Sequence, residues 1–348
     1  MPNFTKINTR SPRFLSVTGT AGEPTSVELK LWNDPDTEPA TVTKILSKPI
    51  PSSNLTTVDY DISPYIREFI SYTDLDVVTG LTATDVSSYA YCEAVVKLDG
   101  VIQSTNYFIG YNGYGYFEDG YNPILDANVM LTEGTYYTLS GANNGALFYF
   151  QEGGLGEIWS ATYVCLDGVT ANETITLTEE NGHIPYVAPT HIGNGGSTLT
   201  ISKDTVVQNT FTFKEVCEPK YTPIVCDFIN KFGAWQTVIF FKVSKSKMTM
   251  SNTAYNMMPE SVDYSVSKSI NQTFNTQGKE SITLNTGWVL EAYNDVMKQM
   301  LLSNEVRLDK RPVTVNTKSL DLFTSINERN INYTLTFNYA NSIINTIQ

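Results

Sequence analysis

The chain has 348 residues, which corresponds to two or three domains of about 150 residues each, and 41% of its residues are hydrophobic. Only 17% are charged, and 36 acidic against 23 basic side chains give a net charge of −13 at pH 7. An acidic surface repels phosphate backbones and anionic lipid, so we expect no direct nucleic-acid binding and no docking on anionic membranes.

The charge is distributed unevenly along the chain. Residues 1–200 carry 8 basic and 23 acidic side chains, whereas residues 201–348 carry 15 basic and 13 acidic ones. No Lys or Arg occurs between Lys97 and Lys203. The sequence therefore predicts an acidic part that projects and a nearly neutral part that is suited to close packing with other subunits.

The beginning of the chain has no apolar run of signal-peptide length, and no stretch approaches the ~18 apolar residues of a membrane span, so we expect neither export nor membrane insertion. The four cysteines match no common zinc spacing, and we expect them to be buried thiols. They are Cys92, Cys165, Cys217 and Cys226. The sequence predicts no metal and no cofactor.

The overall texture is mainly β, with short segments rich in Thr, Tyr and Val between Gly-containing turns. Residues 1–110 are predicted to form an immunoglobulin-like antiparallel β-sandwich. Its expected strands are Phe14–Val17, Ser26–Trp32, Thr41–Ser47 and Thr56–Tyr60. Asp99-Gly100 predicts a type I′ hairpin, because both residues tolerate positive φ.

A short helix is expected to interrupt this first domain. Ser63 would be its N-cap, and Pro64 would occupy the first helical position, where a missing N–H costs nothing. Ile66, Phe69 and Ile70 would then share its buried face.

Residues 111–196 are predicted to form an acidic, β-rich middle domain. Asp167-Gly168 indicates one hairpin, and Asn181-Gly182 indicates another, between Thr174–Thr178 and Ile184–Val187. The Gly-rich stretch Thr190–Ser197 is the expected linker to the next domain.

Residues 197–348 are predicted to form a C-terminal β-sheet with one long amphipathic helix. Strict alternation over Ile331–Tyr339 indicates a strand with one buried face, and Tyr264–Ile270 alternates similarly. The helix is expected over Trp288–Leu302, capped by Asn285 or Thr286. The segment Met248–Leu284, folding around Gln277-Gly278, is expected to extend as a β-arm onto the next subunit.

The apolar segment Phe228–Phe241 is expected to form two strands joined by a turn over Asn230–Gly233. Trp235 in this segment would be a core anchor, or alternatively an intersubunit contact.

Residues able to carry catalysis are few. His183 and His191 lie in predicted loops, and Glu118 and Asp119 are adjacent, so on a strand their side chains would point in opposite directions. The alternating acids of Asp34–Glu38 could ligate calcium, but Pro39 stands where an EF-type loop needs Gly. We therefore expect a protein that is not an enzyme and has no catalytic residues, with glycoside hydrolysis as the least favoured alternative.

The Tyr-Gly run at residues 110–123 has two interpretations. Tyr114, Tyr116 and Tyr121 would stack on sugar rings if their faces were exposed, which would make the protein a receptor- or carbohydrate-binding one. The favoured interpretation is a tightly turning connection in which Gly supplies the unusual φ angles and Tyr covers the edge of the core.

Taken together, several segments resemble virion structural proteins of tailed bacteriophages, notably phages of Bacteroidetes-type hosts. The segments are Arg10–Phe14, Leu29–Trp32, Asp61–Arg67, Gly113–Pro123, Asn230–Trp235, Gly287-Trp288, Leu301–Ser303 and Ile331–Thr334. The resemblance implies a tail, neck or baseplate component, assembled in the host cytoplasm and located in the virion, that forms a symmetric ring and performs no chemistry.

Assembly would use the chain itself and neighbouring virion proteins as partners, and DNA would pass through an acidic lumen without binding. The candidate interface side chains are aromatic or apolar. They are Phe232, Trp235, Phe240, Tyr264, Val266, Trp288 and Tyr293.

Overall fold

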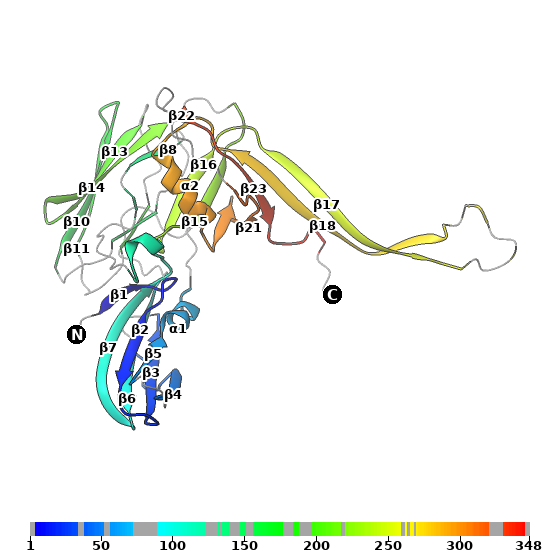
Figure 1. The fold of residues 1–348 in the computed structure, drawn as a ribbon. Coiled ribbons are helices and arrows are strands. Elements are labelled where there is room, and N and C mark those ends of the chain that lie inside the picture. Colours follow the sequence, from blue (N-terminus) through cyan, green and yellow to red (C-terminus); the bar gives the residue numbers. More distant parts are fainter. Residues whose placement is uncertain are drawn as a thin grey trace. The chain divides into compact units, whose positions relative to one another are not determined.

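The computed structural model describes residues 4–33, 38–51, 56–71, 89–122, 131–132, 134–138, 147–150, 156–176, 184–187, 196–216, 220–258, 262, 265–267, 269–319 and 330–344. The fold is mainly β, as predicted (Figure 1). The chain forms two compact units, which do not coincide with the three expected domains. Unit 1 contains Met1–Cys217 and Phe228–Thr237, and unit 2 contains Glu218–Asp227 and Val238–Gln348.

Most of unit 1 is formed by strands β1 to β14, together with the short helix α1 and the 3₁₀ turn η2. They are β1 (Thr5–Asn8), β2 (Phe14–Thr18), β3 (Pro24–Trp32), β4 (Lys44–Pro49), β5 (Thr57–Asp61), α1 (Ser63–Glu68), β6 (Tyr89–Leu98), β7 (Val101–Tyr111), η2 (Phe117–Asp119), β8 (Thr135–Thr138), β9 (Leu147–Phe150), β10 (Ile158–Cys165), β11 (Thr170–Thr176), β12 (Ile184–Val187), β13 (Ser197–Lys203) and β14 (Val206–Glu215).

The first sheet of unit 1 has the strand order β1-β7-β6-β3-β4, and β2 pairs separately with β5. Alternation along β3 buries Val27, Leu29 and Leu31, which pack with Tyr60 of β5 and Ile66 of α1 in one hydrophobic core. β1 runs parallel to β7, a pairing that no local sequence signal indicated.

The β6–β7 turn is confirmed. Asp99 has φ 49° and Gly100 has φ 74°, so both residues have the positive φ that a type I′ turn requires.

The helix α1 also exists, but its expected cap is wrong. The Ser63 side chain caps nothing; instead the backbone N–H of Ser63 donates to Oδ1 of Asp61 at 3.1 Å, and the same oxygen accepts from the N–H of Arg13 at 3.0 Å.

The second sheet of unit 1 has the order β11-β10-β13-β14-β8. The hairpin at Asp167-Gly168 is confirmed between β10 and β11. β10 and β13 pair over seven residues, so strands on both sides of the expected boundary at 196 and 197 belong to one sheet. β12 pairs with β9 and not with β11, which contradicts the third expected hairpin, whose turn at Asn181-Gly182 lies outside the described residues.

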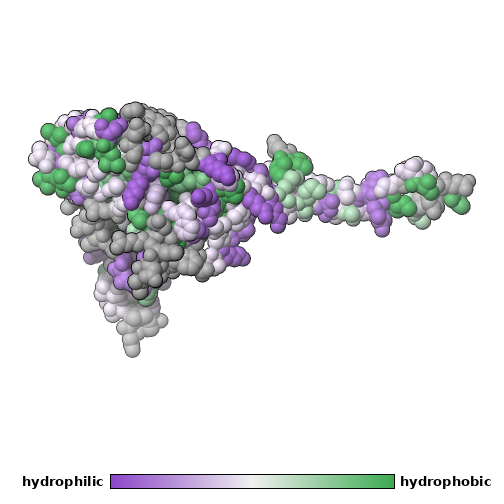
Figure 2. Space-filling view, turned by 90° about the horizontal axis from the view of Figure 1, so that it is seen from above, coloured by the Kyte–Doolittle hydropathy of each residue, from purple (hydrophilic) through white to green (hydrophobic). Residues whose placement is uncertain are grey.

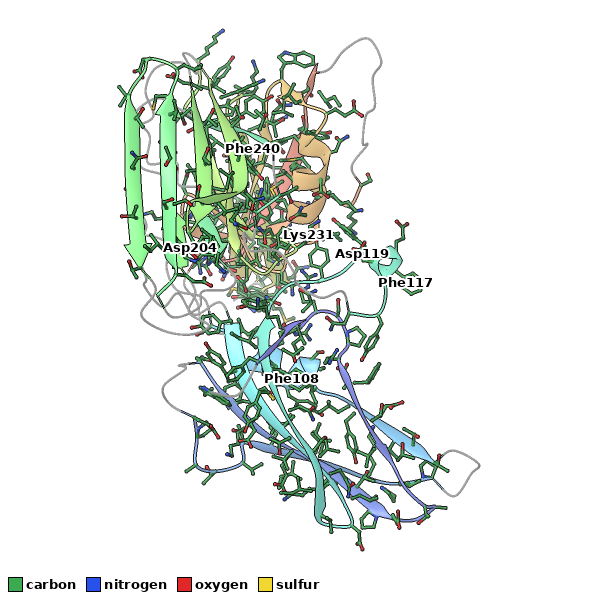
Figure 3. The ribbon with its side chains drawn as sticks, turned by 90° about the vertical axis from the view of Figure 1, so that its left-hand side faces the viewer. Phe108, Phe117, Asp119, Asp204, Lys231 and Phe240 are labelled. Atoms are coloured by element: carbon green, nitrogen blue, oxygen red, sulfur yellow. The ribbon has the colours of Figure 1, made fainter. Side chains whose placement is uncertain are left out.

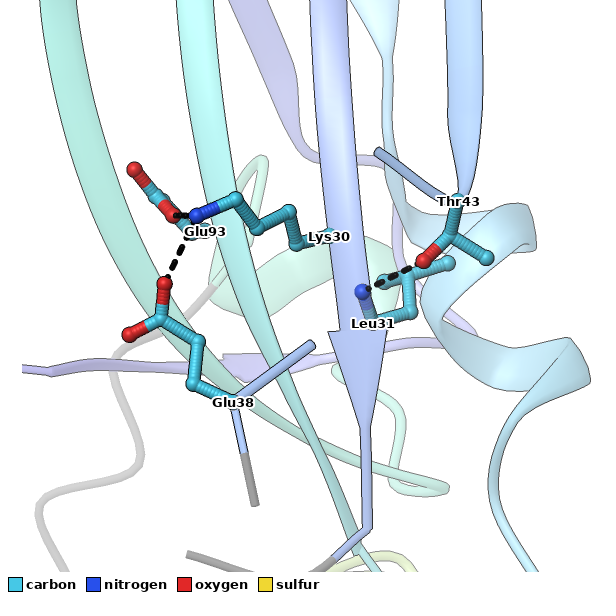
Figure 4. Close-up of polar contacts among 5 residues, drawn as sticks. All are labelled: Lys30, Leu31, Glu38, Thr43 and Glu93. Carbon is cyan, nitrogen blue, oxygen red and sulfur yellow. Dashed lines mark hydrogen bonds and ion pairs between the residues drawn. The ribbon is translucent and has the colours of Figure 1, made fainter. Parts of the chain in front are cut away.

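Lys30 on β3 bridges the carboxylates of Glu93 on the neighbouring strand β6 and of Glu38, which precedes β4 (Figure 4). The ammonium group of Lys30 lies 2.8 Å from Oε1 of Glu38 and 2.6 Å from Oε2 of Glu93, and the Glu93 side chain is only 11% exposed. These hydrogen bonds raise the pKa of Lys30, and the hydrogen bond from Lys30 lowers the pKa of Glu38 below its ordinary 4.5. Lys30 therefore compensates the charge of a largely buried carboxylate.

Replacing Lys30 with Met should lower the free energy of unfolding by about 2 kcal/mol at pH 7, because the charge of Glu93 loses its counterion. The lowered pKa of Glu38 contributes stability that is present above pH 4.5 and is lost as pH falls through the lowered value. Urea unfolding from pH 7 to pH 3 should therefore show a flatter pH dependence for Lys30→Met than for the wild type. The same substitution at Lys97, whose partner Glu28 is 22% exposed, should cost less, and equal losses would contradict this account.

The remaining elements are β15 (Ile224–Ile229), β16 (Trp235–Phe240), β17 (Lys245–Asn256), β18 (Asn271–Asn285), β19 (Val289–Leu290), α2 (Tyr293–Leu301), β20 (Val306–Leu308), β21 (Arg311–Val315), β22 (Asn330–Ile331) and β23 (Thr334–Tyr339). They form a sheet with the order β16-β15-β20-β21-β23-β18-β17, while β19 pairs with β22. The β15–β16 hairpin is confirmed, and its tip, residues 228–237, groups with unit 1.

The C-terminal helix is shorter than expected. α2 has nine residues, and Ala292 is its N-cap, so the expected start at Trp288 and the caps Asn285 and Thr286 are wrong. The cause is a competing pairing: Gly287 turns the chain with φ 77°, and Val289 then pairs with Ile331. The alternation over 331–339 is confirmed, because Ile331, Tyr333, Leu335 and Phe337 are buried.

Candidate functional site

The most distinctive feature of unit 2 is a long two-stranded ribbon. β17 and β18 pair antiparallel from Lys245 opposite Thr283 to Asn256 opposite Asn271, but β23 pairs only with Ser281–Asn285 of β18. Residues 245–280, which we call the arm, therefore extend beyond the rest of the sheet (Figure 1). The expected β-arm exists as a structure; its contact with another subunit stays a prediction.

Two details of the expected arm are wrong. Gln277-Gly278 is not a turn, because β18 continues through it and Gly278 lies opposite Met250. The described residues of 264–270 form a turn region and no strand, so the alternation there was not a sign of pairing. The ribbon instead changes register between Ser251 and Thr253, where Asn275 has φ 51°, a β-bulge that re-aims the outer half of the arm.

The register assigns different side chains to the two faces of the arm. Lys245 and Lys247 share a face with Lys279, which neighbours them across the ribbon. Farther out, Tyr255 and Phe274 meet edge to face with ring centroids 5.6 Å apart. The arm thus carries positively charged side chains where it leaves the sheet and a pair of aromatic side chains farther out.

Most of the described residues of the arm are exposed. Every residue of β17 is exposed, and so are large hydrophobic side chains on and around the arm (Figure 2). They are Met248, Met250, Tyr255, Met258, Val262, Val266, Ile270 and Phe274. A two-stranded ribbon is at best marginally stable in water without packing on one face. This arm therefore has the composition of a surface that another molecule covers.

The base of the arm is held by residues near the C-terminus. The N–H of Ile343 donates to the carbonyl of Gly278 at 3.0 Å, and the side-chain amide of Gln277 bonds the backbone of Ile344 in both directions, at 3.0 and 3.1 Å. A Cβ on Gly278 would lie 2.9 Å from Cδ1 of Ile343, so glycine leaves room for this contact. The described C-terminal residues thereby fix where the arm leaves the sheet.

The structure separates the predicted interface residues into two groups. Trp235, Phe240 and Tyr293 are buried within the chain, which corrects their assignment as interface residues and confirms Trp235 as a core anchor. Of the others, Phe232 is partly buried, Trp288 is 60% exposed and Val266 is 97% exposed. Tyr264 lies outside the described residues.

Tyr114 and Tyr116 are partly buried and Tyr121 is 51% exposed, and all three make side-chain contacts within unit 1. The Arg10 guanidinium lies 4.6 Å from the ring centroid of Tyr114, which in turn meets Tyr116 edge to face. Tyr121 stacks on Phe14 at 5.6 Å, and its hydroxyl accepts a hydrogen bond from the N–H of Phe14. These contacts support the connection interpretation over a sugar-binding platform.

A signal that sequence reasoning missed is Phe117. Its side chain at η2 is fully exposed and points away from the neighbouring residues (Figure 3). The adjacent acids are structural: Oδ2 of Asp119 accepts from the N–H of Tyr116 at 3.0 Å and caps this turn. Glu118 and Asp119 thus lie on a short 3₁₀ turn and not on a strand.

The other described residues that could carry chemistry do not gather at one site. Within the ranges that the structure describes, no group of three or more His, Cys, Asp or Glu could hold a metal. His183, His191, Asp34, Asp36 and Cys217 lie outside those ranges. Cys92, Cys165 and Cys226 are buried as expected, and burial raises the pKa of Cys92 and Cys226 well above its ordinary value, which makes these thiols poor nucleophiles.

Among the described residues, no helix has the length and apolarity that a membrane crossing requires. No protein-family model and no curated protein matches this chain.

Proposed function

We propose that this protein is a structural component of a tailed-phage virion, in the tail, neck or baseplate, that acts by symmetric self-assembly and not by catalysis. The observation that carries the proposal is the arm: a ribbon whose strand β17 is exposed throughout and which carries exposed apolar side chains from its base to its outer half. Symmetric assembly would bury each arm against a neighbouring subunit by contacts that repeat around a closed ring.

Two further features support this proposal. The first sheet and the β2–β5 pair share one core, as an N-terminal β-sandwich would. Cys92, Cys165 and Cys226 are buried, so these three thiols are not presented to a substrate at the surface.

The test replaces residues 248–280 with Asn-Gly, which joins the paired residues Lys247 and Ser281 by a two-residue hairpin turn. Native mass spectrometry and cryo-EM of the purified wild type should show closed oligomers, and the shortened variant should be monomeric with an unchanged unfolding temperature. A monomeric wild type, or a shortened variant with the same oligomers, would contradict the proposal.

Two double variants distinguish the effect of the arm's apolar side chains from the effect of exposed apolar side chains elsewhere. Met248→Ser with Met250→Ser should weaken assembly, whereas Val206→Ser with Val207→Ser on β14 should not. The two pairs are matched in exposure, at 56% and 63% against 62% and 58%. Equal effects would assign assembly to nonspecific apolar contact.

A further inference from the structure

The outer edge of β17 is the part of the arm that is best placed to pair with another strand. In the described part of the chain β17 pairs only with β18, so its other edge presents backbone N–H and C=O groups over twelve residues. Lys245 and Lys247 lie at the base of this edge. Lysines on an edge strand oppose pairing with unrelated or basic edges, so an acidic edge is the complement.

The strand edges of this chain allow a comparison of possible acceptors. Among the described strands that end a sheet, only β4, β11 and β16 are longer than five residues, apart from β17 itself. β4 carries Lys44 and Lys48 and ends at Pro49, so it repels the lysines of β17. β16 is almost entirely buried. β11, with seven residues, is the remaining edge.

β11 has the properties of an acceptor edge. It contains no Lys, Arg or Pro, its charged residue is Glu173, and it belongs to the stretch between Lys97 and Lys203 that lacks basic side chains. The N–H of Cys165 donates to the carbonyl of Val169 at 2.8 Å, and this bond shows which residues of β11 direct their backbone groups toward β10. Residues 169, 171 and 173 therefore face β10, and residues 170, 172 and 174 direct their backbone groups outward.

We propose that the β17 edge of the arm pairs with β11 of a second copy of the chain and adds a strand to that copy's β11-β10-β13-β14-β8 sheet. Backbone hydrogen bonds would supply the affinity, and Lys245 and Lys247 against Glu173 would supply the selectivity. This inference rests on the proposed function, because it names the surface that receives the arm.

A charge swap tests the pairing in the full-length protein. Lys245→Glu with Lys247→Glu should weaken self-association at least tenfold in sedimentation velocity, as should Glu173→Lys alone. The triple variant should recover most of the wild-type association, because Glu on each arm then faces Lys on the next copy. Lys220→Glu with Lys318→Glu, which changes the net charge equally at two exposed lysines outside the arm, should have a smaller effect.

A backbone variant tests the edge itself. Asn172→Pro removes an outward N–H and leaves the bonds to β10 in place, so it should weaken association at least tenfold, while Asn172→Ala should not. If Asn172→Pro fails to fold, the charge swap alone decides the matter. Loss of association on arm removal, without recovery in the triple variant, would overturn β11 as the acceptor and leave the proposed function intact.

Two other results would also overturn the pairing. If removal of the arm has no effect on association, the proposed function fails as well. If the Lys245 and Lys247 substitutions abolish binding to a fluorescein-labelled DNA duplex but leave the oligomer unchanged, the lysines serve a nucleic acid and not a second copy.

Discussion

Replacing Trp235 with Ala should lower the free energy of unfolding of unit 1 by about 4 kcal/mol, the usual cost of emptying a buried Trp site. The Trp235 side chain is fully buried in a cluster with Trp32, Tyr89, Tyr91 and Ile109. Neighbouring aromatic rings such as Trp32 and Tyr91, stacked at 5.6 Å, cannot collapse into the vacated space without losing their own packing.

Trp288 provides the matched control because it is the same residue type with 60% of its surface exposed. Trp288→Ala should change stability by less than about 1 kcal/mol. Guanidinium unfolding followed by far-UV circular dichroism compares the two variants. If both substitutions cost the same, Trp235 would not be the core residue that the structure shows.

Replacing Gly233 with Ala should cost about 3 kcal/mol, because it introduces backbone strain and a collision together. Gly233 has φ 85°, and a Cβ there would lie 2.8 Å from the backbone nitrogen of Asn112 and 2.9 Å from that of Gly113. Neither backbone atom can rotate away. The turn is fixed in addition by Asn230, whose N–H donates to the carbonyl of Ala234 at 2.9 Å.

Gly168 serves as the control for φ alone. It has φ 87° in the β10–β11 turn, but a Cβ there would meet no atom within 4 Å. Gly168→Ala should therefore cost only about 1 kcal/mol. Thermal unfolding of both variants checks the difference, and equal costs would mean that the collision at Gly233 is relieved by a shift of the chain around Asn112.

Local chemistry made several elements predictable from the sequence. The turns at Asp99-Gly100, Asp167-Gly168 and Asn230–Gly233 depend on residues that tolerate positive φ, so their positions follow from a few adjacent side chains. The alternation over 331–339 indicated a buried face for the same reason, because strand periodicity is a property of the backbone. The arm was predictable as a segment, although its turn was misplaced at Gln277-Gly278.

The sequence was a poorer guide to which side chains of the candidate site are exposed. Trp235, Phe240 and Tyr293 are apolar side chains that fit a core and an interface equally well by composition, and only their burial decides between the two. Phe117 looked like part of a Tyr-rich connection, and its full exposure follows from the 3₁₀ turn that Asp119 caps.

By itself, the sequence determined the β class of this protein, its main hairpin turns and the contrast between an acidic and a nearly neutral part. Tertiary structure alone decided the partners: β1 beside β7, β12 beside β9, and β10 beside β13 across the expected boundary. Alternation of apolar and polar residues shows that a strand has a buried face, but it does not specify which other strand lies beside it. The choice among partners depends on packing between residues far apart in the chain, which no local pattern contains.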